Sequence, residues 1–162
     1  MAEETLDAIE KGDSSGLIGI HDIDINLDKF HDYCVRVLNK VGNQNGKKAH
    51  LLFSTLYLIE MAGDEFKNIS IHLTNDFHES RFENIRKMIE YIKEQIGNYY
   101  DLFYKFDEEK VKRISELDQK IYLEVPIMYK KANEEEKEVF HHLRMISRYI
   151  NSLMELRIEM EY

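Results

Sequence analysis

Residues 82–106, with the sequence FENIRKMIEYIKEQIGNYYDLFYKF, decide the fold class of this protein. Their apolar side chains recur at alternating steps of three and four positions, a spacing that gathers them on one side of an α-helix. Because the pattern holds throughout the stretch, it predicts a long helix that packs against other helices. The predicted seam consists of Phe82, Ile85, Ile89, Ile92, Ile96, Tyr99, Phe103 and Phe106.

Similar patterns predict five more helices. We expect a short one over residues 3–11, a second that ends near Lys40, and a third over residues 47–73. Two further helices begin at Asp107, a good N-cap, and at Asn133, which is followed three residues later by a glutamate as in a capping box. The third helix is apolar on nearly every side, so we expect neighbours all around it. The seam predicted for the second helix consists of Ile20, Ile23, Leu27, Phe30, Cys34, Val37 and Val41.

Short connections between helices of this length favour antiparallel neighbours. We therefore expect one all-α domain over residues 1–162, an up-and-down bundle of long antiparallel helices. A weak internal repeat suggests two related three-helix halves, over about residues 1–74 and 78–162, with the first helix truncated. In each half an aspartate that opens a helix is followed by another eleven residues later, and the two pairs are Asp13 with Asp24 and Asp107 with Asp118.

The amino-acid composition argues against several classes of partner and site. Acidic residues outnumber basic ones by 31 to 22, and the net charge of −9 argues against contact with nucleic acid or with an anionic membrane. The single cysteine, Cys34, excludes an internal disulfide and lies in an apolar stripe, as a small core residue does. Neither a signal peptide nor a run of ~20 apolar residues is present, so we expect a cytoplasmic protein without membrane insertion.

The third predicted helix carries a stripe of oxygen-bearing side chains. Glu60, Asp64 and Asn68 recur every four residues and so lie along one side of the helix, flanked by Phe53 and Tyr57. Carboxylates one turn apart repel each other unless something positive lies between them. A metal ion would satisfy Glu60 and Asp64, with Asn68 nearby, and so would an Arg or Lys from a neighbouring helix. Spacing alone leaves both interpretations open, together with plain solvation.

The stretch from Tyr57 to Ile69 resembles the signature helix of the PhoU-like regulators of phosphate uptake. That signature is an acidic residue, three spacers, an Asp, and often an Asn before an apolar residue. The resemblance implies two three-helix units in tandem, with Glu60 and Asp64 at positions that bind iron or zinc. It also implies a non-enzymatic regulatory adaptor that links phosphate transport to a transporter or sensor kinase through protein contact.

The same resemblance sets further expectations. No catalytic residue and no organic cofactor are implied. Separately from the resemblance, exposed seam residues on a long bundle favour a homodimer. Some archaeal relatives carry an AbrB-type DNA-binding domain upstream, so the chain is also interpreted as the C-terminal part of a longer regulator of that type. The second copy of the motif departs from the pattern, because Asn151 replaces the acidic residue and Arg144 and Arg148 stand where Phe53 and Tyr57 flank the first stripe. We therefore expect no second metal site.

A rival constellation consists of carboxylate–histidine pairs three residues apart, Asp28 with His31 and Glu138 with His141. Di-iron carboxylate bundles use such pairs when they face inward from four helices, which makes a di-iron or ferritin-like enzyme one alternative. Ordinary surface pairing explains the same spacing. Since His141 and His142 are consecutive, at most one of them can face a given site. A structural dimerisation module of a larger transcription regulator is the remaining alternative.

Overall fold

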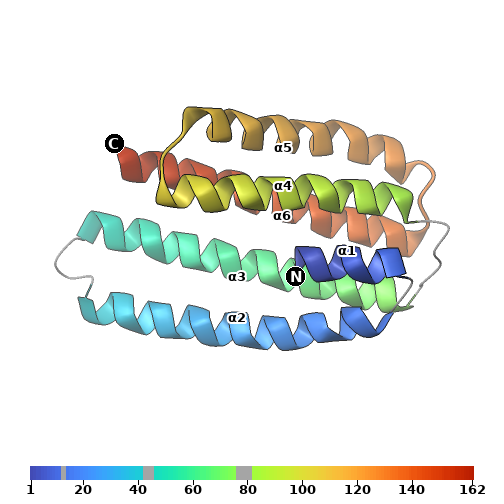
Figure 1. The fold of residues 1–162 in the computed structure, drawn as a ribbon, viewed down its shortest axis with the longest axis horizontal. Coiled ribbons are helices and arrows are strands. Elements are labelled where there is room, and N and C mark those ends of the chain that lie inside the picture. The colour runs from blue at the N-terminus through green and yellow to red at the C-terminus, as the bar shows by residue number, and fades with distance from the viewer. Residues whose placement is uncertain (12–13, 42–45, 76–81) are drawn as a thin grey trace.

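The computed structural model describes residues 1–11, 14–41, 46–75 and 82–162. These residues form six α-helices and no strand, which confirms the all-α prediction, and the long helices run side by side along one axis (Figure 1). The helices are α1 (Ala2–Lys11), α2 (Ser14–Val41), α3 (Gly46–Asn75), α4 (Glu83–Tyr104), α5 (Glu108–Tyr129) and α6 (Glu134–Glu161). None of the described helices combines the length and the apolar character that crossing a membrane requires.

The residues predicted to start the last two helices do so. The Asp107 side chain accepts a hydrogen bond from the Glu109 backbone N–H at 2.9 Å. Asn133 and Glu136 form the complete capping box, in which each side chain accepts from the other residue's backbone N–H at 2.8 Å. These caps satisfy N–H groups that the first helical turn leaves without partners, so local sequence alone places both helix starts.

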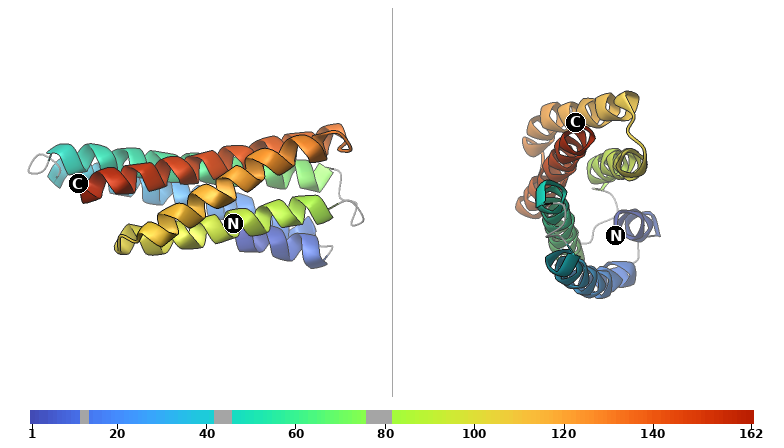
Figure 2. Two further views of the ribbon diagram at one scale, coloured as in Figure 1. Left: turned by 90° about the horizontal axis from the view of Figure 1, so that it is seen from above. Right: turned by 90° about the vertical axis from the view of Figure 1, so that its left-hand side faces the viewer.

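Helices α3 and α6 form the centre of the bundle and share its most extensive contact. Helix α2 packs on α3 and α5 packs on α6, while α4 contacts both α5 and α6. Viewed end on, the chain follows an open curve, with the short α1 between α2 and α4 (Figure 2). The relation between the two halves stays a prediction, and Asp13, on which it partly rests, lies outside the described residues.

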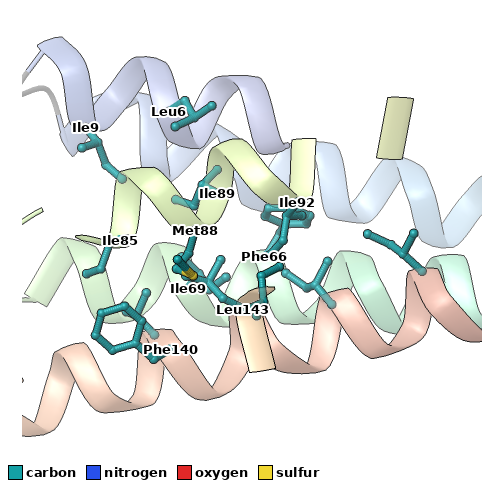
Figure 3. Packing of buried hydrophobic residues seen from close by; sticks show 14 of the residues in the cluster. Leu6, Ile9, Phe66, Ile69, Ile85, Met88, Ile89, Ile92, Phe140 and Leu143 are labelled. Carbon is teal, nitrogen blue, oxygen red and sulfur yellow. The ribbon is translucent and has the colours of Figure 1, made fainter. Parts of the chain in front are cut away.

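One part of the core lies where side chains of α3, α4 and α6 meet. Ile69 from α3, Met88 and Ile89 from α4, and Leu143 from α6 are fully buried and lie close together (Figure 3). Burying an aliphatic side chain of this size stabilises the fold by about 1.5–3 kcal/mol. The predicted α4 seam is therefore confirmed over this part of the helix.

The seam predictions are wrong toward the other end of the bundle. Ile96 of α4 and Val37 of α2 are 37% and 40% exposed, although their spacing places them in the seams. Phe53 and Tyr57 are also exposed, so this part of α3 is not surrounded as expected. For Val37 and Ile96, which line the face between α2 and α4, the physical reason is the length of α1, whose ten residues cover only part of that face (Figure 1).

Candidate functional site

A long apolar groove continues from the start of α1 along the face between α2, α3 and α4. It has a volume of about 1550 Å³, and its lining is mostly apolar. Cys34, which the sequence places in the core, is only half-buried on the groove wall. We call this feature the α2–α4 groove. Prominent lining residues are Tyr33, Val37, Leu56, Ile59, Ile96 and Tyr100.

The dimensions of the groove suit a helix better than a small molecule. Pockets for drug-sized ligands measure about 300–1,000 Å³ and enclose most of the ligand. A helix of ten residues is about 15 Å long and about 10 Å wide, which corresponds to a volume on the order of 1200 Å³. Helix α1 already occupies the adjoining space, and its Leu6 and Ile9 side chains are buried in the core beside α2 and α4.

Aromatic side chains along the groove face solvent. Tyr33, Tyr100 and Tyr104 are 65%, 63% and 73% exposed, and the rings of Tyr100 and Tyr104 lie edge to face with their centroids 5.1 Å apart. Tyrosine combines a large apolar surface with a polar hydroxyl and is therefore enriched at protein interfaces. An apolar groove rimmed by polar residues is typical of surfaces that bind another molecule.

The charged residues along the groove are mostly acidic. Among the residues that the structure describes, Glu3, Glu4, Glu94 and Asp101 line it, together with the basic Lys93. Each of these carboxylates is already in an ion pair: Glu3 with Lys93, Glu4 with the N-terminal amine, Glu94 with Arg113, and Asp101 with Lys110. The net charge of −9 favours a basic partner over an acidic one.

The predicted metal-binding stripe lies on α3 beside the groove. Lys67 donates to Asp64 at 2.5 Å and to Asp24 of α2 at 2.8 Å, and these two hydrogen bonds raise the pKa of the lysine. Asp24 is buried, so Lys67 supplies the positive charge that a buried carboxylate requires. The sequence left open an Arg or Lys from a neighbouring helix, and the structure instead provides a lysine from the same helix.

Glu60 lies close to Asp64, as its spacing predicts. Partial burial raises the pKa of the Glu60 carboxyl, the neighbouring Asp64 raises it further, and His31 of α2 opposes the shift. Asn68, one turn farther along, is half-buried. The described residues bring together one group of three possible metal ligands, and it contains neither Glu60 nor Asp64. A metal at Glu60 and Asp64 therefore stays a prediction.

The two carboxylate–histidine pairs lie on different seams. Asp28 and His31 lie between α2 and α3, where their charges shift the pKa of Glu60. Glu138 lies between α3 and α6, close to His142 and to His72 of α3. His141 is exposed, so the histidine that faces Glu138 is four residues away rather than three. The described residues thus do not gather both pairs into one inward-facing site. His72 was not predicted from the sequence, because neither helix alone determines the register in which α3 packs against α6.

The chain matches no known protein family, no curated protein and no solved structure in the three comparisons made.

The raised pKa of Glu60 leads to a prediction. A carboxyl with a raised pKa contributes stability while it is protonated and loses that contribution as the pH rises through its pKa. Glu60→Gln, which resembles the protonated form, should therefore stabilise the protein at pH 7 by up to about 1 kcal/mol, with no gain at pH 4. Urea unfolding at both pH values measures this difference. Glu159→Gln, at an exposed α6 position, is the control, and equal effects of the two variants would contradict the assignment.

Proposed function

We propose that this protein is a non-enzymatic adaptor that binds a helical segment of a partner protein in the α2–α4 groove. One observation carries the proposal: the heptad seams of α2 and α4 continue past the start of α1 without a helix to cover them. Val37 and Ile96 keep the seam spacing but are exposed on the groove wall. Reception of an amphipathic helix by an apolar groove is a recurring mode of protein recognition.

The proposed occupant is an amphipathic helix with basic residues on its polar face. Its apolar side would pack between α2 and α4 in line with α1, whose own Leu6 and Ile9 pack in this way. Its basic residues would compete with Arg113 and Lys110 for Glu94 and Asp101, because exposed ion pairs of this kind are weak. Complementary charge of this kind selects the partner and speeds association more than it adds affinity.

The resemblance to PhoU-like regulators extends the proposal to a biological role. The partner would be a phosphate transporter or its sensor kinase, and the adaptor would restrain phosphate uptake. Iron or zinc on Glu60 and Asp64 would tune the surface, because these residues adjoin Ile59 and Gly63 on the groove wall. This extension rests on the resemblance of residues 57–69, and the helix-binding proposal does not depend on it.

Two fluorescein-labelled peptides of about 14 residues test the proposal. Both have leucines on one helical face, and the other face carries lysines in the Leu/Lys peptide and glutamates in the Leu/Glu peptide. We expect saturable 1:1 binding of the Leu/Lys peptide by fluorescence anisotropy and weaker binding of the Leu/Glu peptide. The double variant Tyr100→Ala, Tyr104→Ala should weaken binding by roughly tenfold or more, as expected when interface aromatic residues are truncated.

Tyr122→Ala is the matched control. Tyr122 lies on α5, away from the groove, and is 62% exposed, close to the 63% of Tyr100. Equal loss of binding in the control and the double variant would refute the groove as the binding surface. Light scattering provides the second arm: a stable homodimer that the double variant dissociates would make a second copy of this chain the occupant and would overturn the partner-helix proposal.

A further inference from the structure

The seam between α3 and α6 holds a second cluster of chemistry-bearing side chains. His72 of α3 and Glu138 and His142 of α6 each present a potential ligand atom, and these atoms all lie within 4.8 Å of one another. Glu138 and His142 are one helical turn apart and therefore share a face. The imidazole rings of His72 and His142 are stacked, with their centroids 5.4 Å apart.

A carboxylate orients each histidine. His72 Nδ1 lies 2.6 Å from Glu135 Oε2, and His142 Nδ1 lies 2.5 Å from Glu65 Oε2. An ionised carboxylate can only accept, so each Nδ1–H donates. In a neutral imidazole this assignment leaves the Nε2 lone pair available. Histidines that bind metals are usually held in this way by a second carboxylate, which fixes the tautomer and increases the basicity of the ligand nitrogen.

The hydrogen-bond network of His142 and Glu65 extends to a third residue, Tyr149. The Tyr149 hydroxyl donates to Glu65 Oε1 at 3.5 Å, while Oε2 of the same carboxylate accepts from His142. Glu65 and the His142 side chain are mostly buried, at 13% and 14% exposure. Glu138 is exposed and marks the side of the cluster that is open to solvent.

We propose that His72, Glu138 and His142 bind a divalent transition metal, with zinc as the best match, and thereby join α3 to α6. Two imidazole nitrogens and one carboxylate suit Zn²⁺ or Fe²⁺, whereas Ca²⁺ and Mg²⁺ prefer ligand sets of oxygen alone. Three protein ligands leave a coordination position open toward solvent on the Glu138 side. The site differs from the predicted stripe, because His72 lies eight residues, or about 12 Å along the helix axis, beyond Asp64.

The site goes beyond the proposed adaptor function and is tested independently of it. Tag-free full-length protein is freed of metal with a chelator, and Zn²⁺ is titrated in competition with a chromophoric chelator. We expect one Zn²⁺ per chain. Zn²⁺ at about a hundredfold excess over its dissociation constant should raise the melting temperature by roughly 5–11 °C. Co²⁺ in place of Zn²⁺ should produce visible d–d absorption bands, which report ligation directly.

Single-residue variants identify which side chains bind the metal. His72→Ala and His142→Ala should abolish the Co²⁺ bands and lower Zn²⁺ affinity at least a hundredfold, whereas His141→Ala, at the exposed neighbouring position, should leave both unchanged. Glu138→Gln, at an exposed site that does not threaten folding, should also lower Zn²⁺ affinity. Glu65→Gln should keep the Co²⁺ bands but weaken Zn²⁺ binding by about 10- to 100-fold, because it removes a residue that only orients His142.

Three results would overturn the proposal. The first is the absence of stoichiometric Zn²⁺ binding in folded protein. The second is a loss of binding in His141→Ala that equals the loss in His72→Ala. The third is metal that persists in His72→Ala and Glu138→Gln but disappears in Glu60→Ala or Asp64→Ala, which would place the ion at the predicted carboxylate stripe instead.

Discussion

Replacement of Lys67 by methionine is expected to lower the free energy of unfolding by about 3 kcal/mol. Lys67 is the positive partner of Asp24, which is 2% exposed and whose Oδ1 is already without a hydrogen-bond partner. Removal of the lysine leaves a buried carboxylate without its counter-charge, and that loss costs far more than the pair itself contributes. In a chain of this length the melting temperature should fall by roughly 6–12 °C.

Thermal and urea unfolding followed by circular dichroism measure the effect. The control is Lys11→Met, which breaks an exposed pair with Asp7 at 3.0 Å and should change stability by less than about 1 kcal/mol. The double variant Lys67→Met, Asp24→Leu should recover most of the loss, because it removes the stranded charge. A Lys67→Met variant as stable as Lys11→Met would contradict the α2–α3 contact described above.

The second large effect is expected at the junction of α3, α4 and α6. Ile69 is fully buried and packs in the cluster that contains Met88, Ile89 and Leu143 (Figure 3). Ile69→Ala should destabilise the protein by about 2–5 kcal/mol, since it removes buried methyl groups and leaves a cavity that helices packed from three sides cannot close.

Ile71→Ala is the matched control. Ile71 lies two residues farther along α3 and is 51% exposed, so its truncation should change stability by less than about 0.5 kcal/mol. Guanidinium unfolding of the two variants compares the same chemical change on two faces of one helix. Equal losses would mean that the register of α3 differs from that described, and the groove and the His72 cluster would then lose their basis.

Local patterns in the sequence predicted the helices well. The spacing of Ile85, Ile89 and Ile92 depends only on the period of one helix, and the caps at Asp107 and Asn133 depend on contacts within four residues. The same spacing predicted wrongly that Val37 and Ile96 would be covered. Whether a seam residue is buried depends on which helix packs over it. The sequence predicted the short first helix but not where that helix would pack.

The candidate sites show the same difference between contacts within one helix, which the sequence predicts, and contacts between helices, which it does not. The proximity of Glu60 and Asp64 follows from their spacing on one helix, and the structure retains it. Lys67 lies in the same stretch of sequence, but its link to Asp24 depends on how α2 and α3 pack. His72 lies 70 residues before His142 in the sequence. Only the register between two helices brings His72 to Glu138 and His142, so spacing within one helix could not indicate the whole cluster.

The most direct test of helix binding uses Cys34, the single cysteine of the chain, which lies on the wall of the α2–α4 groove. The measurement is the rate of Cys34 alkylation by iodoacetamide, with and without a saturating concentration of the Leu/Lys peptide. A helix seated in the groove should slow the reaction at least tenfold, because it covers the thiol. An unchanged rate, while anisotropy shows the peptide bound, would place the helix elsewhere and contradict the account.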